Sequence, residues 1–294
     1  MGYLLPRIKL PQCSGFYPMI IRQRNYFPLY FCASDKMIQE KCRVIRLERL
    51  SADTRRLFLS APKVAAEARS GQFVMLGLGF DYDPLLRRPF SVHCTDGDEL
   101  VLYFRVVGKG TAMLAAARPG DELPILGPLG KGFRLMPAPA VLVGGGIGIA
   151  PLLLLAKELA GGNNPAAAII LAARSAPDLT PLAESFRPWT ANLLFATDDG
   201  SFGRKGRADE ALFSLSPAPD AVVYACGPPP MLAAIARFCL KKKIACQVSV
   251  ESVMACGMGA CLGCATPAAG GDHGQYVHVC VDGPVFDAEA LPWP

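Results

Sequence analysis

Short apolar runs separated by turn residues follow one another from about residue 37. Two strands are predicted at Cys42 to Leu50 and Arg55 to Ser60, joined by a Ser-Ala-Asp-Thr turn. Further strands are expected within residues 71–78, 87–93 and 99–107, and one short helix at Thr111 to Ala117. Many short strands without long helices predict a small antiparallel β-barrel.

The pattern changes near residue 137. Apolar runs at residues 140–146, 166–174, 192–199 and 221–227 end in glycine or polar residues, and helical patterns follow at 151–160 and 230–242. Buried strands that alternate with helices predict a doubly wound parallel α/β sheet. After Cys246 the helical periodicity ends, and glycine and cysteine become frequent.

These changes divide the chain into four segments. We expect an N-terminal extension outside the fold (1–36), an antiparallel β-barrel (37–136), a doubly wound α/β domain (137–245) and a cysteine-rich domain (246–294). The chain has 30 basic and 25 acidic residues, which gives it a formal net charge of +5. Residues 1–36 contain five basic residues and one acidic residue, so they carry +4 of it. Met37 is a candidate natural start, although an N-terminal strand or partner-binding arm remains an alternative.

The composition excludes several classes of protein. With 51% apolar and 19% charged residues, the chain is not of the disordered type. The small positive charge gives no reason to expect a nucleic-acid partner. No apolar run reaches about 18 residues, so no membrane span is expected. Prolines and arginines interrupt the apolar N-terminus, which argues against a signal peptide and for a cytoplasmic location.

The most specific motif lies among the eleven cysteines. Cys256, Cys261 and Cys264 follow a C-x4-C-x2-C spacing, and Cys280 comes after fifteen intervening residues. This is the plant-type spacing of ligands to a [2Fe–2S] cluster. A four-cysteine zinc site is the main alternative, and a thioredoxin-like redox pair is a weaker one.

Glycines in the same loop support the cluster. Gly257, Gly259 and Gly263 could supply the positive φ angles that tight turns require. Small residues would also let backbone N–H groups approach the sulfurs.

Two segments of the predicted barrel could hold a flavin. Arg88-Pro89-Phe90-Ser91 begins a strand, and Gly108-Lys109-Gly110-Thr111 begins the short helix. Arg88 could balance phosphate charge, whereas Phe90 and Ser91 could contact the isoalloxazine ring. The glycines and the helix N-terminus would suit a pyrophosphate.

The α/β segment has two candidate dinucleotide anchors. Gly144, Gly145, Gly146 and Gly148 form a glycine-rich turn between a strand and a helix. Cys226 and Gly227 end another strand, where a thiol could lie against a nicotinamide ring. The second strand ends in Ala-Arg-Ser rather than in the usual acidic residue, so the choice between NAD and NADP stays open.

These motifs, in this order, resemble the ferredoxin–NADP reductase superfamily over nearly all of residues 37–294. The loop from Glu251 to Cys264, with the segment Val279 to Phe286, looks like that of the electron-transfer subunit of class 1B dihydroorotate dehydrogenase. The sequence MIQEKCRV from Met37 is similar to the start of that subunit.

The resemblance implies a cofactor set and a partner. It places FAD on Arg88, Pro89, Phe90, Ser91, Tyr103, Phe104, Arg105, Gly110 and Thr111, and the cluster on Cys256, Cys261, Cys264 and Cys280. Electrons would pass from the FMN of a separate catalytic subunit through the cluster and FAD to NAD+, in pyrimidine biosynthesis. The family implies a heterotetramer with two copies of each chain.

Several alternatives share this layout. They are the small subunits of sulfide dehydrogenase and of NADH-dependent ferredoxin–NADP oxidoreductase, a self-sufficient reductase for an oxygenase, and a non-enzymatic zinc-stapled binding protein. The chain contains three histidines, none of them in a Ser/His/Asp arrangement, and no residue is assigned as catalytic. This fits an electron relay whose substrate chemistry occurs in another chain.

Overall fold

The computed structural model describes residues 37–78, 83–270 and 275–293. These residues belong to one compact unit. The expected extension at residues 1–36 lies outside them, so its proposed exclusion from the fold stays a prediction. Within the described part, no helix has the length and apolarity needed to cross a bilayer.

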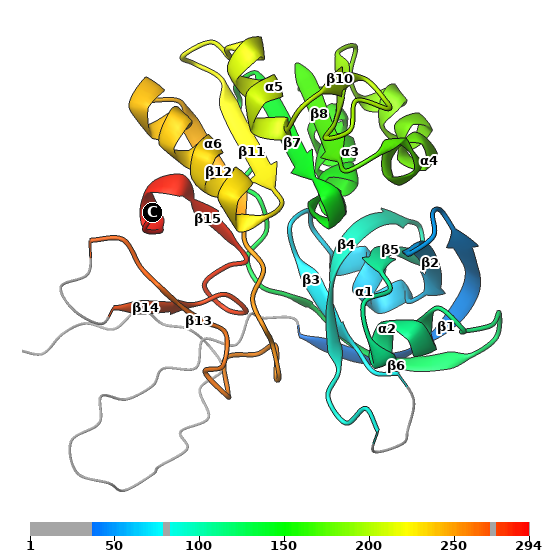
Figure 1. Ribbon diagram of the computed structural model, residues 1–294. Helices are drawn as coiled ribbons and strands as arrows, with labels where there is room; N and C mark the ends of the chain where they lie inside the picture. The colour runs from blue at the N-terminus through cyan, green and yellow to red at the C-terminus, as the bar shows by residue number, and fades with distance from the viewer. Residues whose placement is uncertain (1–36, 79–82, 271–274, 294) are drawn as a thin grey trace, which may run out of the picture. The chain divides into compact units, whose positions relative to one another are not determined.

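The first part of the unit is a closed six-stranded antiparallel barrel, which confirms the predicted antiparallel barrel (Figure 1). Its strands lie in the order β1-β2-β5-β4-β3-β6. Alternate side chains of its strands, among them Phe90 and Val92, point into one apolar core. The helix expected at Thr111 to Ala117 begins earlier and is shorter. The barrel elements are β1 (Ile38–Arg49), β2 (Thr54–Ser60), α1 (Pro62–Glu67), β3 (Phe73–Leu76), β4 (Arg88–Asp96), β5 (Glu99–Arg105), α2 (Lys109–Leu114) and β6 (Glu122–Leu129).

The second part is a seven-stranded sheet in the order β10-β9-β8-β7-β11-β12-β15. The strands from β10 to β12 pair in parallel, which confirms the doubly wound type. One face packs on α3 and α4 and the other on α5 and α6, so β8 is buried along its whole length. The elements are β7 (Ala140–Gly145), η1 (Gly146–Ile149), α3 (Leu152–Gly161), β8 (Ala168–Ala173), α4 (Ala176–Phe186), η2 (Arg187–Trp189), β9 (Leu193–Thr197), β10 (Arg204–Lys205), α5 (Ala208–Leu215), β11 (Val222–Cys226), α6 (Pro229–Lys242) and β12 (Ala245–Ser249).

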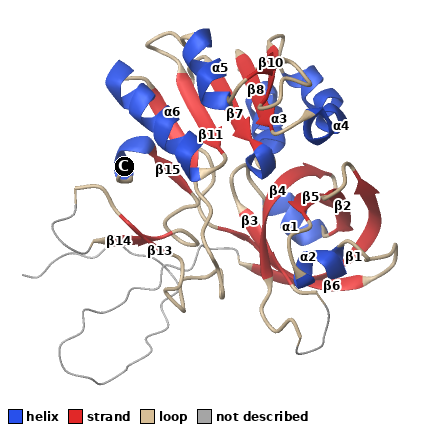
Figure 2. Cartoon of the chain, in the orientation of Figure 1, coloured by secondary structure: helices blue, strands red, loops and turns tan. Residues whose placement is uncertain are grey.

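The C-terminal segment is mostly loop with short strands (Figure 2). It contains β13 (Ala265–Pro267), β14 (Tyr276–His278), β15 (Val285–Asp287) and η3 (Ala288–Ala290). β15 pairs antiparallel with β12, and β12 itself spans the expected boundary between residues 245 and 246. The domain boundaries stay predictions, but the α/β sheet and the cysteine-rich segment share hydrogen-bonded strands.

Candidate functional site

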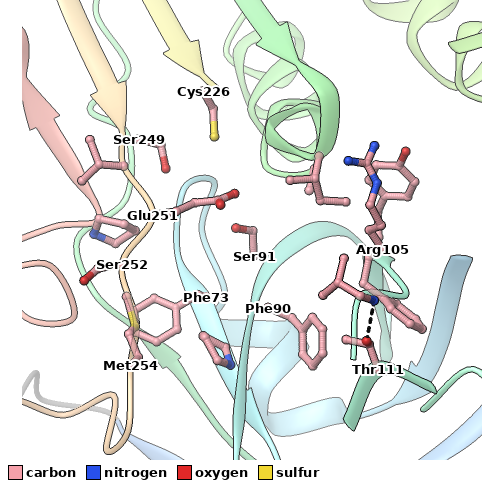
Figure 3. Close-up of a pocket in the computed structure, with 18 residues that line it drawn as sticks. Phe73, Phe90, Ser91, Arg105, Thr111, Cys226, Ser249, Glu251, Ser252 and Met254 are labelled. Carbon is pink, nitrogen blue, oxygen red and sulfur yellow. Dashed lines mark hydrogen bonds between the residues drawn. The ribbon is translucent and has the colours of Figure 1, made fainter. Parts of the chain in front are cut away.

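A pocket of about 370 Å³ lies where the barrel, the α/β sheet and the start of the cysteine-rich segment meet. Figure 3 shows Ser91 and Phe90 on the barrel side, with Cys226 and Ser249 at strand ends opposite them. The residues predicted from the sequence that line the pocket are Pro89, Phe90, Ser91, Tyr103, Phe104, Arg105, Thr111 and Cys226. The structure therefore brings together residues that lie more than a hundred positions apart.

The chemistry of the pocket fits a flavin. Aromatic and apolar walls suit a planar ring, and Arg105 adds a positive charge. The Arg105 Nε atom is buried and lies 3.2 Å from Asp53 Oδ2, yet the angle leaves it without a hydrogen bond. A buried donor without an aligned partner can serve a bound anion such as a diphosphate.

Arg88 and Gly110 lie beside the pocket rather than in its lining. A Cβ atom on Gly110 would come 3.1 Å from Arg88 Nε and 2.7 Å from Leu78 Cδ1, so a larger residue would require these two side chains to move. Arg88 donates a hydrogen bond to the carbonyl of Leu86. Thr111 Oγ1 accepts hydrogen bonds from the backbone N–H groups of Val107 and Gly108, which orders the start of α2.

The glycine-rich turn contacts the end of β11. A Cβ atom on Gly148 would lie 2.5 Å from the carbonyl oxygen of Cys226 and from Gly227 Cα. The two predicted dinucleotide anchors therefore touch each other. A Cβ atom on Gly144 would lie 2.8 Å from Leu152 Cδ1, and one on Gly145 would lie 2.6 Å from Met231 Sδ. Gly146, at φ +56°, has open space beside it.

This packing changes the interpretation of the glycines. Gly148 is needed for close packing, because an added Cβ would overlap the backbone of Cys226 and Gly227. Gly144, Gly145 and Gly227 pack closely against the side chains of Leu152 and Met231, and Gly146 is the member of the turn with free space beside it. The turn continues as η1 before α3 begins, so Pro151 stands at the N-cap of α3 instead of at the first helical position. None of these glycines lines the pocket, but the neighbouring Ile147 and Ala150 do.

Burial controls the ionisation of the groups around the pocket. It raises the pKa of Cys226 to about 12, although Ser249 hydrogen-bonds the sulfur, so the thiol stays neutral. It likewise raises the pKa of Tyr103 to about 12.

Glu251 is a site residue that the sequence reasoning missed. Figure 3 shows its carboxylate reaching into the pocket toward Ser91. Partial desolvation by the pocket walls raises the pKa of this carboxyl group, although the residue as a whole stays exposed, and the charge of Arg105 partly opposes the shift. A carboxylate directly after an apolar run and before the cysteine loop was the signal available in the sequence.

The four predicted cluster cysteines come together as two pairs. Cys264 Sγ and Cys280 Sγ are 3.2 Å apart. The thiols of Cys256 and Cys261 also interact, and the backbone N–H of Cys261 donates to Cys256 Sγ at 3.4 Å. Within the described ranges, no three His, Cys, Asp or Glu side chains surround one point as ligands of a single ion would. Two thiol pairs fit a cluster whose two iron atoms share four cysteine ligands.

Backbone donors surround the sulfurs, as expected. Gly259 N–H donates to Cys280 Sγ at 3.2 Å, and Met258 N–H donates to Cys256 Sγ at 3.4 Å. The hydrogen bond from the Gly263 N–H is the largest of the effects that lower the pKa of Cys261 to about 7. Burial raises the pKa of Cys280 to about 12, so this thiol needs the positive charge of iron to lose its proton.

The expectation for the loop glycines was partly wrong. Gly257 and Gly259 have φ of +74° and +80°, but the third left-handed residue is Leu262, at +59°, instead of Gly263. A Cβ atom on Gly257 would lie 2.5 Å from Met75 Cγ in β3. Both the left-handed turn and the close packing against the barrel therefore require glycine at position 257.

Comparison with known proteins agrees with this site. Residues 251–292 match the iron-sulfur cluster binding domain of dihydroorotate dehydrogenase B, and residues 142–237 match the oxidoreductase NAD-binding domain. Proteins of Desulforamulus reducens and Geobacillus thermodenitrificans are 38% and 39% identical to the chain, over 85% of it and 97% of their own length. Both are named electron transfer subunit of dihydroorotate dehydrogenase B (NAD(+)).

The chain belongs to this family. It is the electron-transfer type of oxidoreductase subunit, with the iron-sulfur and NAD-binding domains that this role requires. Among solved structures, an NADH-dependent reduced ferredoxin-NADP oxidoreductase that performs flavin-based electron bifurcation is 30% identical, with a TM-score of 0.75 over 86% of this chain and 90% of that one. The ferredoxin reductase of carbazole 1,9a-dioxygenase, at 20% identity and a TM-score of 0.61 over 72% of this chain and 68% of that one, shares the fold.

Proposed function

We propose that the chain carries electrons from the FMN of a separate dihydroorotate dehydrogenase subunit, through a [2Fe–2S] cluster and FAD, to NAD+. The reaction would serve pyrimidine biosynthesis in the cytoplasm, in a heterotetramer with two copies of each chain. FAD would lie in the pocket against Ser91, Phe90 and Tyr103, with Arg88, Arg105 and Thr111 near its phosphates. Cys256, Cys261, Cys264 and Cys280 would hold the cluster.

The observation that carries the proposal is how little chain separates the pocket from the cluster loop. Glu251, Ser252 and Met254 line the pocket, and Cys256 follows two residues later. Two residues span at most about 7 Å, so a cluster on Cys256 would lie next to a flavin in the pocket. Cys226, at the opposite wall, marks where the nicotinamide would lie.

Each group in this sequence has a distinct task. Bound FAD would accept single electrons from the cluster and release a pair as hydride. The chain's own residues bind and orient: the buried, neutral Cys226 offers an uncharged surface, and the carboxylate of Glu251 faces the same space. The glycine turn holds Ile147 and Ala150 at the wall.

The relay can be tested with Cys261→Ser in the assembled complex. We expect the variant to lose dihydroorotate-dependent NAD+ reduction while NADH still bleaches the FAD absorbance, because the hydride step precedes the cluster in that direction. Cys239→Ala is the control, since Cys239 is a buried residue of α6 and is not one of the predicted ligands. If Cys261→Ser lost the cluster spectrum but retained dihydroorotate-dependent NAD+ reduction, electrons would not pass through the cluster.

A further inference from the structure

Strand β4 touches both halves of the pocket. Phe90 and Val92 belong to the barrel core, although Phe90 also lines the pocket, and Ser91, between them on the opposite face of the strand, lines it too. The next residue on the outer face is His93. The pairing of β4 with β5 shifts between Val92 and Cys94, so a β-bulge lies at His93. A bulge redirects a side chain that regular pairing would place elsewhere.

The His93 side chain reaches the glycine turn of the other half. Its Nδ1 atom lies 2.7 Å from the carbonyl oxygen of Ala150, directly after η1. A carbonyl oxygen can only accept, so Nδ1 carries the proton and donates. Ala150 and Ile147 both line the pocket, and Ala150 N–H donates to the Ile147 carbonyl at 3.0 Å. One hydrogen bond thus links the flavin-side strand to the nicotinamide-side turn.

Stability alone does not account for a histidine here. The side chain is completely buried, and Nε2 has no hydrogen-bond partner among the described residues. A buried polar atom without a partner destabilises the folded state, whereas a carbon atom at the place of Nε2 would not. The ring centroid lies 5.6 Å from that of Tyr103, another pocket residue.

We propose that His93 is a positioning residue for hydride transfer: its hydrogen bond to Ala150 holds the glycine turn, and with it the nicotinamide, in register with the flavin on β4. The proposal rests on the proposed function, since it assumes that both groups share the pocket. Hydride transfer tolerates little error in the distance between donor and acceptor, and a misplacement of about 1 Å can cost a hundredfold in rate.

Three variants of the full chain, loaded with FAD and cluster, test this role. His93→Phe removes the donor and keeps a ring. His93→Asn keeps an N–H donor close to the position of Nδ1. Cys94→Ala is the matched control, because it removes a different β4 contact to the α/β half, the one with Lys157 Nζ at 3.3 Å.

Two readouts are needed, one of which does not depend on activity. Amide hydrogen exchange of residues 146–154 should become at least about 10-fold faster in His93→Phe and stay unchanged in Cys94→Ala. Stopped-flow reduction of FAD at saturating NADH should slow by roughly 10- to 100-fold in His93→Phe and recover to within about threefold of wild type in His93→Asn. FAD content and the cluster spectrum should be unchanged in all three.

The outcomes separate this proposal from the function on which it rests. If the turn exchanges faster but hydride transfer keeps its rate, or if Cys94→Ala slows hydride transfer as much, the positioning role is refuted. An unchanged exchange rate in His93→Phe also refutes it. If NADH fails to reduce FAD in the wild-type chain, the proposed function itself fails.

Discussion

At the scale of single residues, the site combines groups whose ionisation is suppressed by burial. Cys226 and Tyr103 are held neutral by the protein around them, and His93 behaves in the same way. Burial lowers the pKa of His93 from 6.5 to about 4, although the hydrogen bond to Ala150 acts in the opposite direction. Arg56 adds a smaller effect that also disfavours the charged ring.

The His93 shift predicts a pH dependence of stability. Between pH 6.5 and about 4 the unfolded chain binds a proton at this residue and the folded chain does not. Stability from this residue is therefore fully present above pH 6.5 and is lost as the pH falls toward 4. The complete loss would be about 3 kcal/mol.

His93→Asn isolates this contribution, because asparagine keeps a donor and does not titrate. Urea unfolding should show wild type losing about 2 kcal/mol more than the variant between about pH 7 and about pH 5. Equal losses in the two proteins would mean that His93 is protonated in the folded state.

At the scale of elements, the cysteine loop is shaped by its neighbours as much as by its own sequence. Gly257 packs on Met75 in β3, Gly259 on Val281, and Cys264 and Cys280 join the core formed by β3, β6 and α6. The loop could be assigned to a cluster from spacing alone because its ligands are close in sequence. The residue that takes the left-handed turn, Leu262, could not be assigned, since a nearby glycine was the better local candidate.

Gly257→Ala should destabilise the loop by more than the strain of its left-handed backbone alone. Gly270→Ala is a matched control: φ is +72° against +74°, but nothing lies within 4 Å of the added methyl group. We expect about 1–2 kcal/mol of strain in both variants and a further 1–3 kcal/mol in Gly257→Ala from the overlap with Met75. Iron content and thermal unfolding would measure the difference, and equal behaviour would show that Met75 moves aside without cost.

Other elements show the same limit. Strands β1 to β5 of the barrel and the first and last helices of the α/β part were predicted from apolar periodicity, whereas β6 was not. Helices α1, α4 and α5 were missed: α1 and α5 are only six and eight residues long, and α4 contains Pro177 and Pro181. Strand β15 was missed because its partner β12 lies more than thirty residues away, as the pairing of Val248 with Phe286 shows.

At the scale of the whole molecule, the cluster loop has an exposed side. Cys261 is exposed, whereas Cys264 and Cys280 are only 2% exposed, so a cluster would be accessible from the Cys261 side. The apolar residues of this loop, here called the apolar rim, are Ala260 and Leu262, which are exposed, and Ala255 and Met258, which are partly buried. A partner that delivers electrons would dock on this apolar rim.

Leu262→Asp tests the rim without unfolding the loop, because aspartate accepts a left-handed backbone better than leucine does. We expect the affinity for the catalytic subunit to fall about 10-fold or more, with FAD still bound. Leu240→Asp is the matched control, since Leu240 in α6 is 44% exposed against 49% for Leu262. Equal affinities in surface-binding measurements would place the partner elsewhere.

The sequence by itself determined the barrel, the parallel sheet, the four-cysteine spacing typical of a [2Fe–2S] cluster and most of the residues on the barrel side of the pocket. It could do so because periodicity and ligand spacing are local properties of the chain. The tertiary structure decided that Gly148 packs on Cys226, that Glu251 enters the pocket, that the thiols form two pairs and that His93 reaches Ala150. Each of these contacts joins side chains or backbone from separate elements, and no local pattern of residues specifies such a contact until the chain has folded.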